Sequence, residues 1–389
     1  MPYAKNSFYT PDLAPLLNKV DATDKGLLVE FTDGREQLFS WFWVRDHGID
    51  DVSLDQGTLQ RMVDTFAIPR DIGCKSIKFD AESQLIDLLW SDDARSTISA
   101  YMLASVVKQT SSRHDLAPHK PRVFWDKDNS LLKMPEVEFQ AIIESDEGLL
   151  QWLENIHVYG FSLVHNVPPN ETATTEMAMR IGRVQETIFG KMWPLSSDLT
   201  DHGDTAYTTS YLEPHTDGTY YDDAAGLQMF NCLEIDCKGG ESIQVDGFAI
   251  AQRIKREDPK AYKTLSEVVV PAHYMETAVH LRAERPTFKH DREGELVQVS
   301  FNNYDRAPFL LSDQDDERFH HAYALFHRHA LDQDNWLKIP MQAGTTLIFD
   351  NWRNMHGRMG YVGKRVFYGC YHSRAEYESK LRVLRASQS

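Results

Sequence analysis

Two His-x-Asp tripeptides in this chain have the spacing of a metal-binding pair. They are His-Gly-Asp at 202–204 and His-Thr-Asp at 215–217, in a chain that contains 16 histidines. Because side chains alternate along a strand, such a tripeptide on a strand or at its end places both side chains on one face. A surface turn is the plain alternative for either one. The residues favour His215 and Asp217 only modestly, because this pair follows the run AYTTSYLEP and precedes an aromatic-rich turn.

A third ligand could come from His356, which lies far along the chain behind the apolar run TTLIFD. Two histidines and one carboxylate on one face of the metal are the ligand set of non-haem Fe(II) oxygenases. Arg358 and Arg365 follow His356, and a 2-oxoglutarate site needs a cation about one strand beyond the last ligand. A solvated histidine beside a basic surface stretch is the alternative, and the residues alone leave both interpretations open.

The composition excludes several other classes of function. The net charge is −17, from 41 Lys and Arg against 58 Asp and Glu, which argues against a nucleic-acid partner. No apolar run approaches the roughly 20 residues of a membrane span, and the N-terminus lacks a targeting pattern. The four cysteines form no CxxC pair, which indicates a reducing compartment, and we expect a cytoplasmic protein.

The pattern of elements predicts two domains and a mainly β fold with helical insertions. Residues 1–116 show short strands with polar turns, including a hairpin around Asp33-Gly34, and predict a small antiparallel β domain. A polar, proline-containing stretch then leads into a second domain, 117–389. There, helices predicted over 146–160, 175–190 and 246–267 interrupt the strands, as in a double-stranded β-helix, or jelly roll.

Several long motifs cover most of the chain: WVRDH, YGFSLVHNVPP, ETIFGKMW, DTAYTTSYLEPHTDGTY, GGESIQVDGF, FNNYDRA, DNWRNMHGR and YGCYHSR. These motifs and their order resemble the gamma-butyrobetaine hydroxylase and trimethyllysine dioxygenase family of Fe(II)- and 2-oxoglutarate-dependent oxygenases. FNNYDRA and DTAYT are more similar to the trimethyllysine branch. The resemblance implies that His215, Asp217 and His356 bind iron, that Arg365 binds 2-oxoglutarate, and that O2 is the second co-substrate.

The same resemblance implies an aromatic cage for a trimethylammonium group. Trp193, Tyr207 and Tyr371 match cage positions. Phe189 stands at a further cage position, where the family resemblance implies Tyr. A quaternary ammonium cannot donate a hydrogen bond, so ring faces bind it through cation–π attraction. Aromatic residues make up 11% of the chain, however, and core packing is the alternative role for each of them.

Asp204 and Asn302 are expected at the other end of the substrate. A carboxylate there suits a substrate with a free ammonium and would repel a carboxylate or phosphonate unless a cation such as Arg306 neutralised it. We therefore expect hydroxylation of N6-trimethyllysine, at C3, rather than of gamma-butyrobetaine or a trimethylammonio-phosphonate. The alternative role of Asp204 is a structural ion pair with Arg306.

The N-terminal domain of this chain departs from that of the family, which resembles a small zinc module. Gly48, Ile49, Asp50 and Asp51 follow WVRDH, and Cys74 has no partner cysteine, so we expect no zinc. The resemblance also implies a homodimer. Two functions of other classes are kept as alternatives: a jelly-roll protein that binds a betaine-like ligand without turnover, and a zinc hydrolase using the same His and Asp residues.

Overall fold

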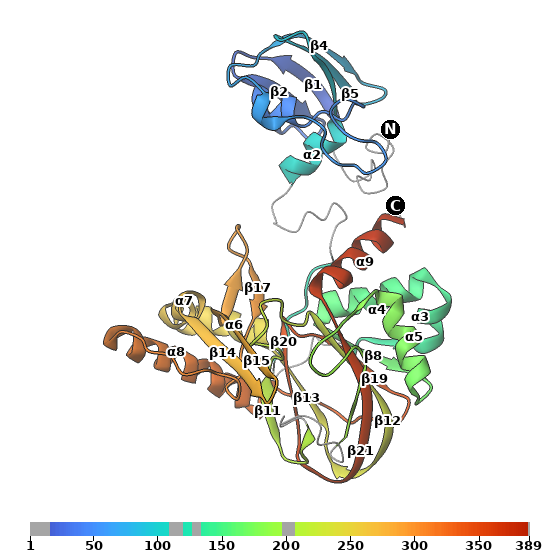
Figure 1. Ribbon diagram of the computed structural model, residues 1–389, viewed down its shortest axis with the longest axis vertical. Coiled ribbons are helices and arrows are strands. Elements are labelled where there is room, and N and C mark those ends of the chain that lie inside the picture. The colour runs from blue at the N-terminus through green and yellow to red at the C-terminus, as the bar shows by residue number, and fades with distance from the viewer. Residues whose placement is uncertain (1–15, 109–119, 127–133, 197–206, 388–389) are drawn as a thin grey trace. The chain divides into compact units, whose positions relative to one another are not determined.

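The structure, a computed structural model, describes residues 16–108, 120–126, 134–196 and 207–387 (Figure 1). These residues fall into two compact units, one formed by residues up to 108 together with 382–387, the other by the described residues from 120 to 381. The predicted domain boundary, between residues 116 and 117, lies outside the described residues.

The described part of the smaller unit contains two antiparallel sheets of three strands each. The first has β1 (Leu17–Ala22), β2 (Gly26–Phe31) and β3 (Glu36–Ser40), and the second has β4 (Cys74–Asp80), β5 (Leu85–Trp90) and β6 (Arg95–Ser99). Helices α1 (Trp41–Asp46) and α2 (Ala100–Lys108) follow β3 and β6, and the short helix η2 (Thr65–Ala67) lies between the two sheets in sequence. The hairpin predicted around Asp33-Gly34 is confirmed, because β2 pairs with β3.

An apolar core stabilises the smaller unit. Leu27, Ile86, Trp90 and Ile98 are fully buried within it. Cys74, which the sequence leaves without a partner cysteine, is half-buried on β4, and its thiol donates to backbone carbonyl oxygens of the same sheet. The absence of zinc from this domain stays a prediction.

The two largest sheets of the larger unit position the site. The larger sheet runs β10-β21-β12-β19-β8-β7, with β9 also paired to β21, and the smaller runs β11-β20-β13-β18. Only the pairing of β7 with β8 is parallel among the described strands. The bounds are β7 (Glu136–Glu138), β8 (Phe161–His165), β9 (Val184–Gln185), β10 (Trp193–Leu195), β11 (Leu212–His215), β12 (Leu227–Gly239), β13 (Ser242–Asp246), β18 (Leu337–Ile339), β19 (Thr346–Asp350), β20 (Asn354–Arg358) and β21 (Tyr361–His372).

Helices and two hairpins decorate these sheets, so the predicted fold class, mainly β with helical insertions, is confirmed. They are α3 (Phe139–Glu144), α4 (Asp146–Tyr159), α5 (Glu171–Ile181), α6 (Gly247–Glu257), α7 (Pro259–Glu267), α8 (Asp313–Leu331), η4 (Gln333–Asn335) and α9 (Arg374–Ser387), with β14 (Val269–Glu276) paired to β15 (Val279–Pro286) and β16 (Phe288–His290) to β17 (Leu296–Val299).

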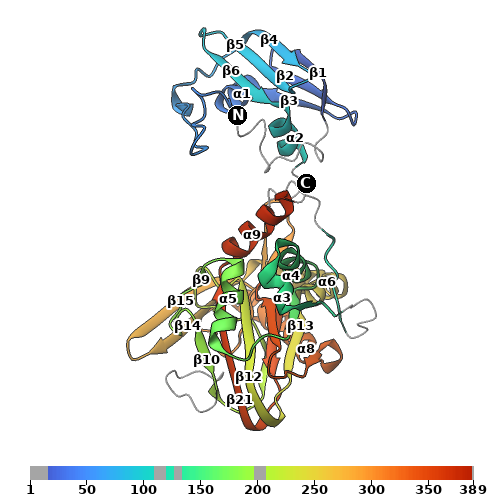
Figure 2. The ribbon, with the colours of Figure 1, turned by 90° about the vertical axis from the view of Figure 1, so that its right-hand side faces the viewer.

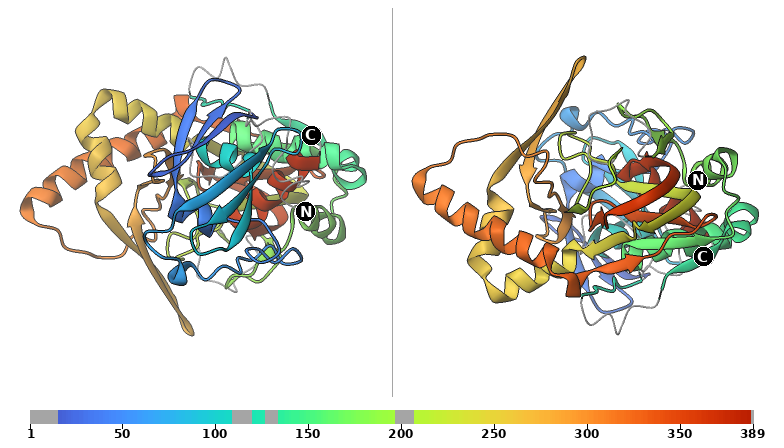
Figure 3. Two further views of the ribbon diagram at one scale, coloured as in Figure 1. Left: turned by 90° about the horizontal axis from the view of Figure 1, so that it is seen from above. Right: turned by 90° about the horizontal axis from the view of Figure 1, so that it is seen from below.

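Helices α3 to α8 form two groups on opposite sides of the strands. Helices α3 to α5 lie on one side, with α4 packed on β8 and β19 and α5 on β21, while α6 to α8 lie on the other (Figures 1 and 3). Figure 2 views the strands from the side of α3 to α5. Within the described residues, no helix has the length and apolar character that a membrane crossing requires.

The helix predicted over 175–190 is wrong in its second half. Helix α5 ends at Ile181, and Val184 instead begins β9, which pairs with β21 at Tyr371 and His372. Gly182 follows the last helical residue, and a Cβ there would collide with the carboxylate of Glu376. The apolar residues keep a helical spacing beyond Ile181, but the chain does not form a helix there. Strand pairing with β21 outweighs the helical preference of these residues. The chain from β9 onward therefore runs beside the larger sheet.

A buried ion pair joins the smaller sheet to the segment that precedes α3. The guanidinium of Arg353 and the carboxylate of Asp246 are 2.7 Å apart, and both side chains are 0% exposed. Arg353 also donates to the carbonyl oxygens of Val123 and Val158, while Asp246 accepts from the backbone N–H groups of Phe248 and Ala249 in the first turn of α6. Every part of this pair therefore has a partner.

Removal of the Asp246 carboxylate should greatly reduce the stability of the protein. Asp246→Ala leaves the Arg353 charge buried without its carboxylate, which should lower the free energy of unfolding by about 3–5 kcal/mol. The matched control is Glu234→Ala, which breaks the exposed pair with Lys364 at 2.9 Å and should change stability by about 1 kcal/mol or less. Urea unfolding followed by circular dichroism measures both, and equal effects would contradict the prediction.

Candidate active site

Three side chains predicted to bind a metal come together between the two sheets. His215 ends β11 and is the direct cross-strand partner of His356 on β20. Asp217 lies two residues beyond the end of β11, in a bend rather than on the strand. Gly357 allows the close approach of the two strands, since a Cβ there would collide with the carbonyl oxygen of Leu212.

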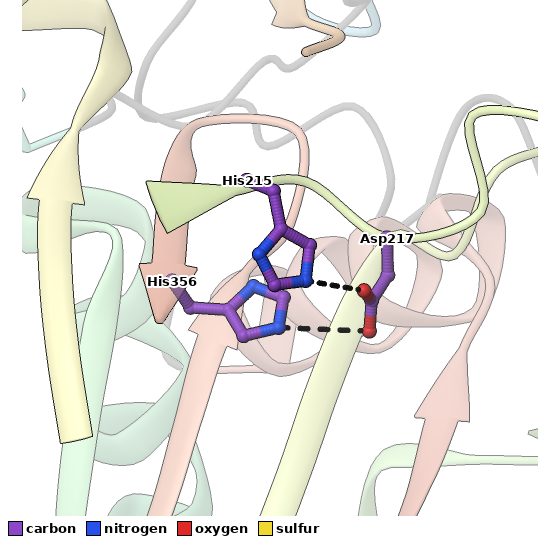
Figure 4. Close-up of side chains that lie close together, drawn as sticks. All are labelled: His215, Asp217 and His356. Carbon is purple, nitrogen blue, oxygen red and sulfur yellow. Dashed lines mark ion pairs between the residues drawn. The ribbon is translucent and has the colours of Figure 1, made fainter. Parts of the chain in front are cut away.

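The ligand atoms of these three residues lie within 4.8 Å of one another (Figure 4). Nε2 of His215 is 3.2 Å from one carboxylate oxygen of Asp217, and Nε2 of His356 is 3.6 Å from the other. The two imidazole centroids are 4.4 Å apart. His202, in the competing tripeptide, lies outside the described residues, as does Asp204.

Local hydrogen bonds fix the orientation of His215. Its Nδ1 lies 2.7 Å from the carbonyl oxygen of Glu213, which can only accept, so Nδ1 carries a proton and Nε2 faces Asp217. Burial opposes the charged imidazolium, but the hydrogen bond and charge of Asp217 outweigh it and raise the pKa of His215. A bound cation would take the place of the Nε2 proton.

The pKa values of His356 and Asp217 shift in the opposite direction, downward. Burial lowers the pKa of His356 to about 3, so this imidazole is neutral and its nitrogen lone pair is available. Burial alone would raise the pKa of Asp217, but the neighbouring imidazoles of His356 and His215 hold it below its usual range. The cluster thus offers an ionised carboxylate and one neutral imidazole at neutral pH.

Asn351 holds the bend that carries Asp217. Its side-chain oxygen accepts the backbone N–H of Asp217 at 2.8 Å, and its amide donates back to the Asp217 carbonyl at 3.0 Å. The amide also donates to the carbonyl oxygen of Ala225 at 2.9 Å. Asn351 is 1% exposed and follows β19 directly, so the larger sheet sets the position of this carboxylate.

The cluster fits an iron ion better than a structural zinc ion. Its two imidazoles and one carboxylate leave positions open for co-substrates, whereas a structural zinc site is closed by about four ligands. His356 also keeps a buried Nδ1 with no hydrogen-bond partner among the described residues. The donor set, its burial and its closeness therefore suit Fe(II) with exchangeable positions.

Arg365 is a buried cation that suits a dicarboxylate. It lies on β21, is 6% exposed, and donates to the hydroxyl of Ser242 at 3.3 Å. It forms no ion pair with any described carboxylate, and its Nε has no hydrogen-bond partner among the described residues. Burial, together with the charge of Arg358, lowers the pKa of Arg365 to about 10, and the group stays charged at neutral pH. A carboxylate of 2-oxoglutarate would satisfy this guanidinium.

One cavity of about 370 Å³ connects Arg365 with the three predicted metal ligands, His215, Asp217 and His356, which are called the metal cluster below. Its walls come from both sheets: Ser242, Gln244 and His356 from the smaller sheet, and Gln228, Phe349 and Arg365 from the larger. Such a volume is in the usual range for a small-molecule site.

Comparison with known proteins decides the family. A family model described as "Taurine catabolism dioxygenase TauD, TfdA family" matches residues 115–371. The mitochondrial trimethyllysine dioxygenase of Mus musculus is 33% identical over 358 residues, which cover 90% of this chain and 84% of that protein. The chain belongs to the TauD/TfdA family. It is a 2-oxoglutarate-dependent dioxygenase, and the resemblance inferred from the sequence is confirmed.

Two further similarities have lower identity. The gamma-butyrobetaine dioxygenase of Pseudomonas sp. strain AK-1 is 29% identical over 384 residues, which cover 96% of this chain and 97% of that protein. A solved taurine dioxygenase structure from Burkholderia xenovorans covers 60% of this chain and 84% of its own, with a TM-score of 0.45 and 13% identity.

In this TauD/TfdA family member, the four residues predicted to form an aromatic cage line the same cavity as the metal cluster. Phe189 and Trp193 have ring centroids 6.1 Å apart, Trp193 and Tyr371 4.6 Å, and Phe189 and Tyr207 6.5 Å. The structure thus brings together four rings from β10, β21 and the segments beside them. Their role as a cage remains a proposal.

Asn302 also lines the cavity, but sequence reasoning missed its neighbours. The amide of Asn302 donates to the carboxylate of Asp305 at 2.7 Å, and Asp305 is itself a lining residue. Tyr274, on β14, adds a further ring to the wall, 6.5 Å from Phe189. Asp305 stands in the quoted motif FNNYDRA and could have been found there, whereas no local signal marked Tyr274.

Proposed function

We propose that this chain hydroxylates a small trimethylammonium substrate, N6-trimethyllysine at C3, using Fe(II), 2-oxoglutarate and O2. The observation that carries this proposal is the presence of an aromatic wall, a His–Asp–His cluster and a buried arginine in one cavity. The relatives named trimethyllysine dioxygenase support the choice of substrate.

His215, Asp217 and His356 would hold the iron, and Arg365 would hold the distal carboxylate of 2-oxoglutarate. Iron in such a site supplies the oxidising chemistry with O2. The chain's own contribution is geometric: the cage fixes one end of the substrate, and the polar wall around Asn302 fixes the other. Together they choose which carbon faces the metal cluster.

The polar wall favours a substrate with a free ammonium. Asp305 accepts hydrogen bonds from Asn302 at 2.7 Å and from Thr219 at 3.3 Å, so a carboxylate lines the cavity even without Asp204, which lies outside the described residues. Nearby negative charge favours an ammonium and disfavours the bare carboxylate of gamma-butyrobetaine or a phosphonate. Arg306 donates to the side chain of Asn303 at 3.2 Å. The alternative in which Arg306 pairs with Asp204 stays open, because Asp204 lies outside the described residues.

A substrate panel tests the proposal and its nearest rivals. The protein is loaded anaerobically with Fe(II), then given O2, 2-oxoglutarate and N6-trimethyllysine, gamma-butyrobetaine or a trimethylammonio-phosphonate. Products are read by mass and succinate is quantified. We expect one added oxygen on trimethyllysine with equimolar succinate. Preference for gamma-butyrobetaine, supported by the Pseudomonas relative, would replace the substrate but not the reaction.

The same assay separates the two alternatives of other classes. A betaine-binding protein without turnover would form neither succinate nor a hydroxylated product with any substrate. A zinc hydrolase would act anaerobically and would not respond to 2-oxoglutarate. Either result would overturn the proposed reaction.

Loss of one cage ring should weaken substrate binding. Trp193 is 5% exposed and lies against both Phe189 and Tyr371, so its ring face is desolvated. Trp193→Leu should raise KM for the trimethylammonium substrate about 10-fold, since a desolvated cation–π contact contributes about 1–2 kcal/mol. Trp193→Phe keeps a ring and should raise it less. Equal effects of Leu and Phe on KM would contradict the cage assignment.

Cellular location and oligomeric state stay predictions. The four described cysteines are free thiols, which supports the proposed cytoplasmic location. A homodimer rests on the family resemblance, and sedimentation velocity would test it.

A further inference from the structure

The cage residue Tyr371 also contacts the metal cluster directly. Its hydroxyl donates to one carboxylate oxygen of Asp217 at 2.7 Å, although the two residues are 154 positions apart. The side chain is 7% exposed, and β21 fixes its backbone opposite Gln228 of β12. One residue therefore presents a ring to the substrate wall and a hydroxyl to the predicted iron ligand.

The two oxygens of Asp217 have different surroundings. The oxygen near His215 lies 3.2 Å from Nε2, while the other accepts the Tyr371 hydroxyl and lies 3.6 Å from Nε2 of His356. A hydroxyl at 2.7 Å uses one lone pair of that second oxygen with a charge-assisted hydrogen bond. The carboxylate can then neither rotate freely nor offer both oxygens equally to a cation.

We propose that Tyr371 is a positioning residue that holds Asp217 as a one-oxygen ligand and links the substrate cage to the metal site. This inference rests on the proposed function, because it takes the cluster as the iron site. The link is short: a substrate that presses on the ring moves the hydroxyl that orients the ligand. Loss of the hydroxyl should therefore affect the metal first and the substrate little.

The test compares two phenylalanine variants on the same strand. Tyr371→Phe keeps the ring and removes the hydroxyl, whereas Tyr368→Phe removes a hydroxyl that does not line the cavity. Co(II) alone is titrated into each metal-free protein, and the visible spectrum reports affinity and coordination. Outer partners of metal ligands typically contribute 10–100-fold in metal affinity. Tyr371→Phe should bind Co(II) about 10-fold more weakly with an altered spectrum, and Tyr368→Phe should match the wild type.

Turnover gives the second readout. With Fe(II) saturating, Tyr371→Phe should keep KM for the trimethylammonium substrate within about 3-fold, because the cation–π surface remains. It should also form more succinate than hydroxylated product. Trp193→Leu should show the reverse pattern, with raised KM and unchanged Co(II) affinity.

The outcomes are distinguishable from failure of the proposed function. Wild-type Co(II) affinity and spectrum in Tyr371→Phe would overturn the inference, and so would loss of its fold, which would make the hydroxyl purely structural. If wild-type protein converts none of the panel substrates, the proposed function fails, while the Co(II) comparison still tests Tyr371.

Discussion

His356→Ala should abolish both succinate formation and substrate hydroxylation. The imidazole of His356 is one of only three ligand groups in the described cluster, and Asn354 to Arg358 of β20 offer no other imidazole or carboxylate in its place. Changes to outer partners already reduce metal affinity about 10–100-fold, so loss of a direct ligand should cost more than that. Fe(II) retained after gel filtration, succinate and product mass measure the effect.

The matched control for this prediction is His321→Ala. His321 lies on α8, has a side chain that is 60% exposed, and contacts Asp258 rather than the cavity. It should keep wild-type iron content and turnover. If His356→Ala retained turnover while folded, the assignment of the three metal ligands would be wrong.

Arg365→Met should raise KM for 2-oxoglutarate by roughly 100-fold. Truncating one partner of a buried, hydrogen-bonded charge pair costs about 2–5 kcal/mol, and about 3 kcal/mol corresponds to roughly 100-fold. The substitution keeps an unbranched apolar stem against the ring of Phe367, which now lies 4.1 Å from the guanidinium carbon. Binding of the trimethylammonium substrate, measured by isothermal titration calorimetry, should change little.

Two comparison variants make this prediction specific. Lys364→Met removes a cation from the adjacent position of β21. The side chain of Lys364 is 52% exposed and pairs with Glu234, so KM for 2-oxoglutarate should stay at its wild-type value. Arg365→Lys keeps the charge without the planar fork and should give an intermediate KM. An unchanged KM in Arg365→Met would mean that another group binds the co-substrate.

Local elements were predictable where one pattern acted alone. The helix predicted over 146–160 is α4, which spans Asp146–Tyr159 and ends at Gly160, and the structure adds a cap by the side chain of Ser145. The pattern over 175–190 failed because a non-local pairing, β9 with β21, competes with a helix that the same residues could form. That failure matters for function, since the strand pairing directs the chain toward Phe189 and Trp193.

The sequence predicts both the family and the residues of the site. His215, Asp217 and His356 stand in long, specific motifs, and Arg365 lies between two of them, DNWRNMHGR and YGCYHSR. The family is confirmed, and the roles of these four residues are proposals. The contacts that hold these residues in place became visible in the folded structure. Asn351 supports the bend of Asp217 across 134 positions, and Tyr371 orients its carboxylate across 154. Such contacts arise where the ends of strands from two sheets meet, and strand periodicity reports which face a side chain occupies but not which distant residue lies opposite it.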